Sequence, residues 1–226
     1  MGNEAKNQTG KRKVVKTRSG RSREKEFTLY GWNACMRLFD NRPQDIFRVF
    51  FSEERSRRLS EVKKYCRSKK LPYRQLPPED LKKVAASVHH EGVIMVVRPL
   101  GEKSAYTLLQ QHLKPDCILV ALDQIENPHN VGAILRSCSY FGVAGMIMSP
   151  GEKQALVTSS AARMAEGGLE FVSIYECTDL PSLLRDFKSR TISVIGADPE
   201  ARHSLFEIDI SFPCIVALGN EREGLS

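Results

Sequence analysis

The chain has 226 residues, 41% of them hydrophobic and 27% charged, which is the balance of a globular protein and not of a disordered one. The longest apolar run covers residues 117–122, far short of the roughly 18 residues that a membrane-spanning helix needs. The N-terminus also lacks the apolar core of a secretory signal. These features argue against a transmembrane or a secreted protein.

The net charge of +7 is distributed unevenly along the chain. Residues 1–26 carry +6, residues 27–100 carry +7 and residues 101–226 carry −6. A basic front half joined to a mildly acidic back half predicts a polyanionic partner for the front half. A merely soluble basic protein stays open as the alternative, because charge alone does not distinguish the two.

The six cysteines are at least 21 residues apart, so the sequence contains no C-x-x-C pair of the zinc-binding type. Most of them stand in apolar stretches, which is typical of buried small hydrophobic residues in a reducing compartment such as the cytoplasm. The five histidines are scattered. We expect no metal site.

The front half begins with a basic segment, residues 1–26, that has no apolar periodicity and is predicted to be a disordered tail. Such a tail either neutralises phosphates or merely keeps the protein soluble. Residues 27–99 alternate between helical and extended patterns and predict a small α/β domain. The expected elements are helices at 33–39, 56–69 and 78–87 and strands at 46–51, 71–76 and 92–97, with Pro72 placing the second strand at a sheet edge.

The predicted helix at 56–69 concentrates the positive charge of this domain. Its basic side chains are expected to be exposed and to contact the phosphates of a polyanionic partner. The candidate residues for this contact are Arg57, Arg58, Lys63, Lys64 and Arg67.

Residues 98–104 combine Pro, Gly and charge, and we expect a domain boundary there. In the back half, residues 104–226, short apolar strands alternate with helices, which predicts a parallel sheet covered on both faces. The expected strands are 117–122, 144–148, 169–174, 191–195 and 214–218, and the expected helices are 104–113, a helix ending at 141, 158–166 and 181–188.

Polar, charged and glycine residues follow three of the predicted strands. Ligands of parallel sheets bind at the carboxyl ends of the strands, so these segments are candidate binding sites. The segments are 123–136 (D-Q-I-E-N-P-H-N-V-G-A-I-L-R), 195–198 (I-G-A-D) and 218–226 (L-G-N-E-R-E-G-L-S). In the first, Asn130 is placed to cap the helix, and Gly132 permits close approach of a ligand or another backbone. Arg136 lies off the apolar stripe of that helix. An ordinary cap and a solvated charge stay open for Asn130 and Arg136.

In the third segment, Gly219 directly follows a buried strand, and Glu221 and Glu223 stand between it and Gly224. A surface turn with acidic residues is the alternative to a functional loop. No G-x-G-x-x-G follows a strand and no phosphate-binding loop is present, so a Rossmann dinucleotide site is not expected.

Taken together, N-P-H-N-V-G-A-I-L-R at 127–136, F-G-V at 141–143 and L-G-N-E-R-E-G-L at 218–225 resemble the SpoU-type (TrmH family) RNA ribose 2′-O-methyltransferases of the SPOUT superfamily. The stretch S-S-A-A-R-M-A-E-G-G at 159–168 is similar, less closely, to the mid-domain segment of that family. The front domain resembles, more weakly, the substrate-binding domain with a ribosomal-protein-like fold that many members carry, as at Tyr30-Gly31.

The resemblance implies an α/β-knot domain that transfers a methyl group from S-adenosylmethionine to a ribose 2′-hydroxyl of tRNA or rRNA, without a metal and as a homodimer. It implies that Arg136 is the catalytic arginine, in a site completed by the second subunit, and that Asn130 and Glu221 frame this site. Because a free guanidinium has a pKa above about 12, we expect Arg136 to hold phosphate and ribose and not to act as a general base. The implied cofactor-binding residues are Ile195, Gly196, Ala197, Leu218, Gly219 and Gly224.

The third motif of the family, a Ser-Leu-Asn-type loop that enters a final helix, is not found before Ser226. In the family this segment ties a trefoil knot and forms part of the methyl-donor pocket. We therefore expect the domain to be incomplete at the C-terminus and the 226-residue chain to bind S-adenosylmethionine weakly or not at all. The alternative function is a non-catalytic RNA-binding protein with a degenerate or truncated methyltransferase-like domain. A small-molecule methyltransferase fits the basic front half poorly.

Overall fold

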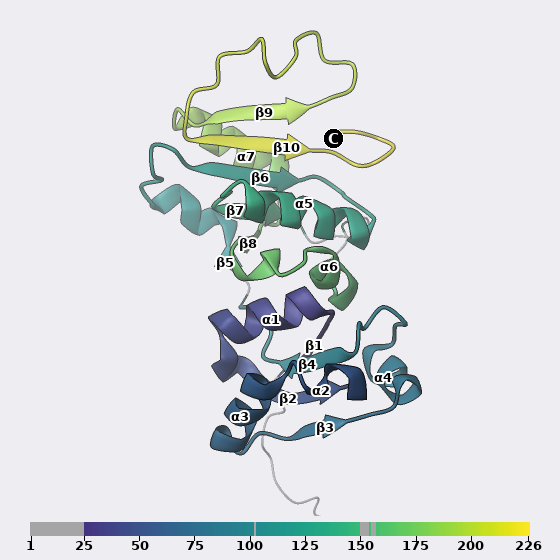
Figure 1. Cartoon of the computed structure of the whole chain (residues 1–226). Helices are drawn as coiled ribbons and strands as arrows, with labels where there is room; N and C mark the ends of the chain where they lie inside the picture. Colours follow the sequence, from purple (N-terminus) through teal and green to yellow (C-terminus); the bar gives the residue numbers. More distant parts are fainter. Residues whose placement is uncertain (1–24, 102, 150–153, 155–156) are drawn as a thin grey trace, which may run out of the picture.

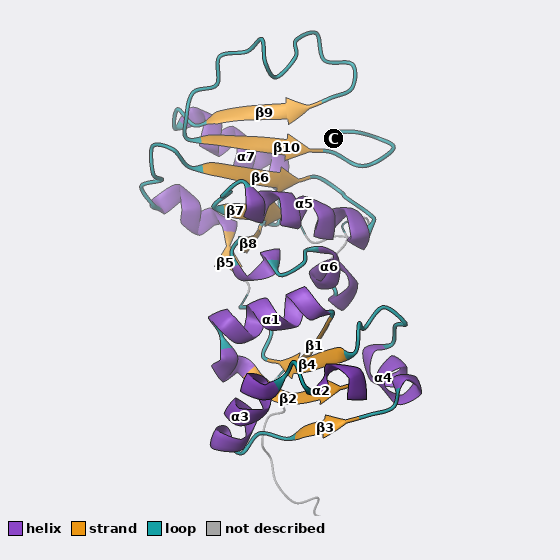
Figure 2. Cartoon of the chain, in the orientation of Figure 1, coloured by secondary structure: helices purple, strands orange, loops and turns teal. Residues whose placement is uncertain are grey.

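The computed structural model describes residues 25–101, 103–149, 154 and 157–226. The predicted disordered tail, residues 1–26, lies outside the described residues except for its last two positions. Within the described part, no helix is long and apolar enough to cross a membrane. The described chain forms two sheets, one in each half, with helices between them (Figures 1 and 2).

The N-terminal half contains a four-stranded sheet in the order β1-β4-β2-β3. β4 pairs antiparallel with both β1 and β2, and β3 runs parallel to β2 at the edge, where Pro72 predicted an edge strand. The strands are β1 (Phe27–Tyr30), β2 (Ile46–Phe51), β3 (Tyr73–Gln75) and β4 (Val93–Val97), and the helices are α1 (Trp32–Asn41), α2 (Glu53–Ser56), α3 (Ser60–Lys69) and α4 (Pro78–Ala85).

The two faces of this sheet are covered differently. Leu38 of α1 and Cys66 of α3 pack with Val49 and Met95 on one face, whereas Leu81 of α4 packs with other residues on the opposite face. β4 is buried along its whole length, as expected of a continuous apolar strand with helices on both sides.

The C-terminal half contains a six-stranded, fully parallel sheet in the order β5-β8-β7-β6-β10-β9, as the alternating pattern predicts. The strands are β5 (Lys103–Ser104), β6 (Ile118–Leu122), β7 (Gly145–Met148), β8 (Ser173–Glu176), β9 (Ser193–Ala197) and β10 (Cys214–Leu218). The helices are α5 (Pro128–Tyr140), α6 (Ser159–Met164) and α7 (Leu180–Ser189). Figure 1 shows α5 and α7 on opposite sides of this sheet.

Alternation along β6 explains this arrangement, because successive side chains of a strand point to opposite faces. Val120 and Leu122 join the cluster that contains residues of α5, while Leu119 and Ala121 join the cluster that contains residues of α7. All six cysteines are buried and unpaired, in agreement with their interpretation as small hydrophobic residues.

The two halves are joined by α1, which lies between the sheets (Figure 1). One hydrophobic cluster includes Leu38 of the front half and Leu135 and Leu169 of the back half. The Arg42 guanidinium donates to both carboxylate oxygens of Glu170, at 2.7 and 3.2 Å, and both side chains are almost fully buried. We call this contact between the two halves the seam. A second ion pair crosses it, with the arginine on the back half and the carboxylate on the front half.

In this second pair, Arg163 of α6 donates to the Glu91 carboxylate at 2.8 Å and to the backbone carbonyl of His89 at 2.9 Å. Glu91 also accepts the backbone N–H of Trp32. The two ion pairs and the shared cluster fix the halves relative to one another.

Several predicted elements differ from those observed. The helix expected at 56–69 is two helices, because Ser52 caps α2 by accepting from the Arg55 N–H and the chain turns before α3 so that Leu59 is buried. The helix expected at 104–113 is the short β5 followed by a 3-10 helix, Ala105–Gln110. The strand expected at 169–174 is a 3-10 turn, Gly168–Glu170, followed by β8, because Gly167 with φ +92° starts a turn there.

Candidate active site at the carboxyl edge of the parallel sheet

The three chemically marked strand ends meet at one edge of the sheet. β6, β10 and β9 are neighbours, with Leu122 paired to Leu218 and Leu218 paired to Ala197. The loops after these strands therefore leave the sheet side by side, as the carboxyl ends of parallel strands must. The site is built from the loop of residues 123–127, the start of α5 and the loop of residues 219–226.

Asn220 ties two of these loops together. Its side chain is buried, and its Nδ2 donates to the Gln124 carbonyl at 2.7 Å and to Glu126 Oε1 at 3.2 Å. Its Oδ1 accepts the backbone N–H groups of Arg222 and Glu223. The backbone of Asn220 also exchanges two hydrogen bonds with Gly224, so the loop folds back on itself.

Glu221 is the next residue of this loop, and its carboxylate faces the start of α5. It accepts the backbone N–H groups of Glu126 and Asn127, each at 3.1 Å, and the Asn130 Nδ2 at 2.8 Å. Partial burial alone raises the pKa of the Glu221 carboxyl, but these donated hydrogen bonds outweigh it and hold the pKa below its usual value. Glu221 is therefore ionised at neutral pH.

The helix cap is Asn127, and the expectation that Asn130 caps this helix is wrong. The Asn127 side chain accepts the His129 N–H, and Pro128 follows at the first helical position. Asn130 lies within the first turn, where its amide is free to reach Glu221. The two polar residues that the motifs single out, 91 positions apart, are thus in contact.

Close backbone approach requires glycine at position 219, whereas Gly196 faces only the end of a flexible side chain. A Cβ at Gly219 would lie 2.1 Å from the Gly224 carbonyl carbon, and one at Gly196 would lie 2.7 Å from Leu225 Cδ1. Gly224 has φ +76°, a conformation that favours glycine. Loop closure therefore accounts for Gly219. Ile195 is half-buried, whereas Gly196 and Ala197 are exposed at the end of the edge strand β9.

Comparison with known proteins agrees with this arrangement. The sequence model of the SpoU rRNA Methylase family matches residues 117–226, and that of the RNA 2′-O ribose methyltransferase substrate binding domain matches residues 28–103. An uncharacterized tRNA/rRNA methyltransferase of Mycobacterium marinum is 32% identical over 92% of this chain and 67% of its own length. The chain belongs to the SpoU rRNA methylase family. The family resemblance predicted from the motifs is thus confirmed.

Two further comparisons show how much of a longer relative the chain covers and how similar its fold is to a solved structure. The chain is 32% identical to the uncharacterized tRNA/rRNA methyltransferase YfiF of Escherichia coli, but it spans only 59% of that protein. The SpoU methyltransferase AviRb of Streptomyces viridochromogenes, solved in complex with AdoMet, superposes with a TM-score of 0.70 at 20% identity, covering 93% of this chain and 79% of AviRb. The α/β fold predicted from the sequence, with a front substrate-binding domain, is that of the family.

Arg136, which the resemblance implies is the catalytic arginine, does not join the Asn130–Glu221 contact in this chain. It stands six residues further along α5, about 9 Å at 1.5 Å per residue. The Arg136 side chain is exposed while Val131, Leu135 and Cys138 are buried, so its predicted position off the apolar stripe is confirmed. Gly132 admits another backbone: a Cβ there would lie 2.4 Å from the Ala161 carbonyl oxygen of α6.

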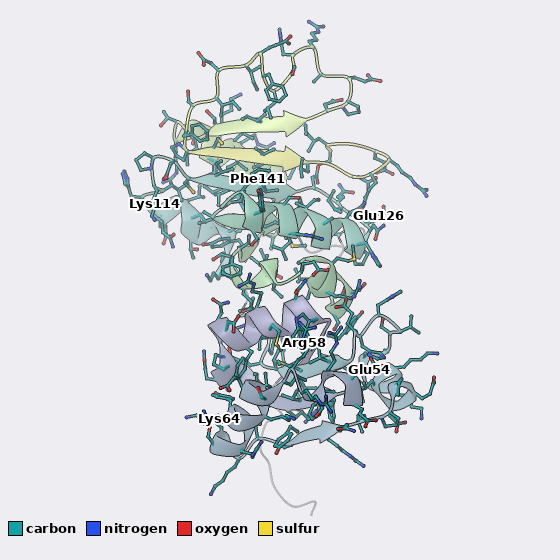
Figure 3. The ribbon with its side chains drawn as sticks, viewed as in Figure 1. Glu54, Arg58, Lys64, Lys114, Glu126 and Phe141 are labelled. Atoms are coloured by element: carbon teal, nitrogen blue, oxygen red, sulfur yellow. The ribbon has the colours of Figure 1, made fainter. Side chains whose placement is uncertain are left out.

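The candidate RNA-binding residues do not share one environment. Arg57, Lys64 and Arg67 are exposed and make no side-chain hydrogen bond or ion pair with the described residues. Arg58 is exposed, but its guanidinium lies over the Trp32 ring, 4.2 Å from the centroid. Figure 3 shows Arg58 and Lys64 at separate places on the front half.

Lys63 is half-buried and not fully exposed as expected, because its ammonium donates to Ser56 at 3.1 Å and lies near the Phe51 ring. Its replacement would remove packing as well as charge. Among the residues that the structure describes, no three His, Cys, Asp or Glu side chains gather as a metal site requires.

Asn220 is the residue of this edge that sequence reasoning missed. It stands inside the quoted motif, between Gly219 and Glu221, but no local pattern distinguishes a buried bridging amide from an exposed turn residue. Gln154 was missed as well: its buried amide donates to the Ile125 carbonyl and accepts the Ile125 N–H. No signal in the sequence pointed to it.

Proposed function

We propose that this protein transfers a methyl group from S-adenosylmethionine to a ribose 2′-hydroxyl of tRNA or rRNA. Residues 104–226 form the methyltransferase domain in this proposal, and residues 27–99 hold the RNA. The observation that carries it is the contact between Asn130 and Glu221 at the carboxyl edge of the sheet, in a chain of the SpoU family. The six buried thiols fit a reducing, cytoplasmic setting.

The methyl donor fits the edge formed by β9 and β10. Exposed backbone groups at Gly196 and Ala197 are available to a ligand, and Ile195, Leu218, Gly219 and Gly224 complete the proposed cofactor-binding set. S-Adenosylmethionine supplies, when bound, an electrophilic methyl group, so the protein need not activate it. No metal is required for this chemistry.

The residues of this chain then position and polarise the ribose. Glu221, kept ionised, holds the loop of residues 219–226 against the start of α5 through three hydrogen bonds. We assign to Arg136 the binding of the RNA phosphate and ribose. Its positive charge lowers the pKa of the 2′-hydroxyl by stabilising the oxyanion that forms as the hydroxyl proton passes to water.

A homodimer follows from the position of Arg136 in this proposal, because one chain does not bring Arg136 to its own Asn130–Glu221 contact. The exposed face of α5 that carries Arg136 continues into Tyr140 and Phe141, which are 83% and 74% exposed. Figure 3 labels Phe141 on the C-terminal half. Two such faces in contact would bring Arg136 of one subunit toward the site of the other.

The test measures transfer of a radioactive methyl group from S-adenosylmethionine to RNA isolated from a strain that lacks the gene, using the protein expressed from its complete gene. Alkaline hydrolysis identifies the product, since a 2′-O-methyl group protects the adjacent phosphodiester. Alkali-resistant radioactive dinucleotides are expected. Methylated bases, or RNA binding without methyl transfer and without cofactor binding, would overturn the proposal, and the second result would favour the non-catalytic alternative.

A further inference from the structure

A pocket of about 520 Å³ opens at the seam between the two halves, away from the Asn130–Glu221 contact. It is lined by α1, α5 and the turn that follows α6. The lining residues that bear chemistry are Asn33, Arg37, Arg136, Tyr140, Glu166 and Phe171. The volume falls within the usual range of ligand pockets.

Two arginines from different halves face this pocket. Arg37 comes from α1 and Arg136 from α5, and both side chains are exposed. Neither guanidinium makes a hydrogen bond or an ion pair with the described residues. By contrast, Arg42 and Arg163, at the same seam, are both paired with carboxylates. Two arginines at the seam are therefore used in ion pairs, and Arg37 and Arg136 are available to bind a ligand.

Two consecutive glycines place the available arginines. A Cβ at Gly167, whose φ is +92°, would lie 2.4 Å from Arg37 Cγ, so the aliphatic stem of Arg37 lies directly over this glycine. A Cβ at Gly168 would lie 3.3 Å from Arg136 Cα. Side chains at positions 167 and 168 would therefore push α1 and α5 away from the turn.

The remaining groups favour a nucleotide over a simple anion. Phe171 is 54% exposed, which leaves its ring open to stacking. Glu166 also lines the pocket, and its carboxylate accepts the Asn33 amide. Two arginines against this one carboxylate leave a net positive charge. Arg37 adds to the positive charge of the front half, whereas Arg136 is a basic group on a half whose net charge is −6.

We propose that this pocket binds one nucleotide of a single-stranded RNA segment that crosses the seam. Arg37 and Arg136 hold its backbone phosphates and an aromatic ring of the pocket stacks on its base. The inference rests on the proposed function, which it extends by giving the RNA a path from the front half to Arg136. Single-stranded RNA is the class that fits, because bases inside a duplex do not present their faces to aromatic side chains.

Two variants with matched controls test the pocket. Arg37→Gln removes the charge but keeps a stem over Gly167. Arg185→Gln removes an equal charge from an exposed position of α7, which covers the opposite face of the sheet. Phe171→Leu removes the ring, and Phe171→Tyr keeps it.

The probe is a fluorescein-labelled, mixed-sequence oligoribonucleotide of about 12 nucleotides, titrated by anisotropy between about 50 and 200 mM KCl, alone and annealed to its complement. Arg37→Gln is expected to lower single-strand affinity about fivefold to tenfold and to reduce the slope of log affinity against log salt by about 0.7. Phe171→Leu is expected to lower single-strand affinity at least about fivefold and to leave duplex binding unchanged.

The proposal would be overturned if Arg37→Gln and Arg185→Gln changed the affinity for single-stranded RNA equally. It would also be overturned if both Phe171 variants bound this RNA as tightly as the wild type. If Arg37→Gln fails to fold, the Phe171 variants decide, because Arg136 already belongs to the proposed methyl-transfer site. If the wild type transfers methyl groups and these variants change RNA affinity no more than their controls, the RNA-binding role of the pocket is refuted and the proposed function stands. Specific loss of RNA binding in a protein that transfers no methyl group supports the pocket and refutes the proposed function. A wild type that binds no RNA refutes both.

Discussion

Arg42 is expected to be the most sensitive charged residue of the seam. Replacement by alanine leaves the Glu170 carboxylate, whose side chain is 3% exposed, without its ionic partner. Removing one member of a buried ion pair typically costs about 3–5 kcal/mol. Because both side chains are nearly inaccessible, solvent screening does not reduce this figure, and against a total stability of about 5–15 kcal/mol it is a large loss.

The reverse replacement, Glu170→Ala, is expected to cost less. Arg42 keeps two other partners, the Asp45 carboxylate at 3.3 Å and the Arg98 carbonyl at 2.8 Å. Its charge therefore stays compensated. We expect a loss of about 1–2 kcal/mol, in the range of a lost hydrogen bond to a charged group. The two replacements differ in expected cost because Arg42 has other partners, whereas Glu170 loses its ionic partner.

Urea denaturation and thermal denaturation, each followed by tryptophan fluorescence, measure both variants, since Trp32 is the sole tryptophan and lies at the seam. For a chain of this size, Arg42→Ala should lower the Tm by roughly 6–20 °C. Arg48→Ala is the control, because Arg48 pairs with Glu26 at an exposed position and its loss should cost at most about 1 kcal/mol. An Arg42→Ala variant no less stable than Glu170→Ala would refute the reasoning.

Four further outcomes are expected. Arg136→Ala should abolish methyl transfer in the protein expressed from its complete gene. Binding of S-adenosylmethionine, measured by calorimetry, should stay nearly intact, because removal of the exposed side chain leaves no cavity. Unfolding of this variant would show a structural role instead. Because the folded-state pKa of Glu221 is lowered, its stabilisation is present above the usual value of 4.5 and is lost as the pH falls below it. The difference in urea midpoint between wild type and Glu221→Gln should therefore be present at about pH 6 and shrink below pH 4.5; a constant difference would contradict this. The six buried thiols should react with a disulfide reagent only slowly in the native protein and rapidly in urea, because burial raises their pKa values. Replacing Arg57, Lys64 and Arg67 together by Ala should flatten the salt dependence of RNA binding and spare the fold; an unchanged slope would move the RNA surface elsewhere.

The elements that the sequence predicted well are those with continuous apolar runs. β2 and β10 have the predicted bounds, and β4 and β6 begin one residue later than expected. The elements that were missed depend on distant partners. The four residues of β1 follow a charged tail and show no pattern of their own, yet they pair along their whole length with β4.

The same distinction holds at the candidate site. Local patterns left Asn130 as a possible cap and the loop at 218–226 as a possible surface turn, and only the combined motifs linked them. A hydrogen bond between residues 91 positions apart is not visible to any local rule. Arg37 is a stronger case, because nothing around it on α1 marks it. Its position at the pocket depends on a glycine 130 residues later in the chain.

The rigidity of the seam has a consequence for RNA recognition under the proposed function. Arg42–Glu170 and Glu91–Arg163 both join front to back, and the hydrophobic cluster is continuous between the halves. The basic front surface therefore stands at a fixed distance and angle from Arg136. A protein with such a geometry selects an RNA that already has, or adopts at its own cost, the matching shape. Loosening the seam should accordingly lower discrimination among RNAs more than it lowers affinity for any one of them, because the phosphate contacts survive while their spacing does not.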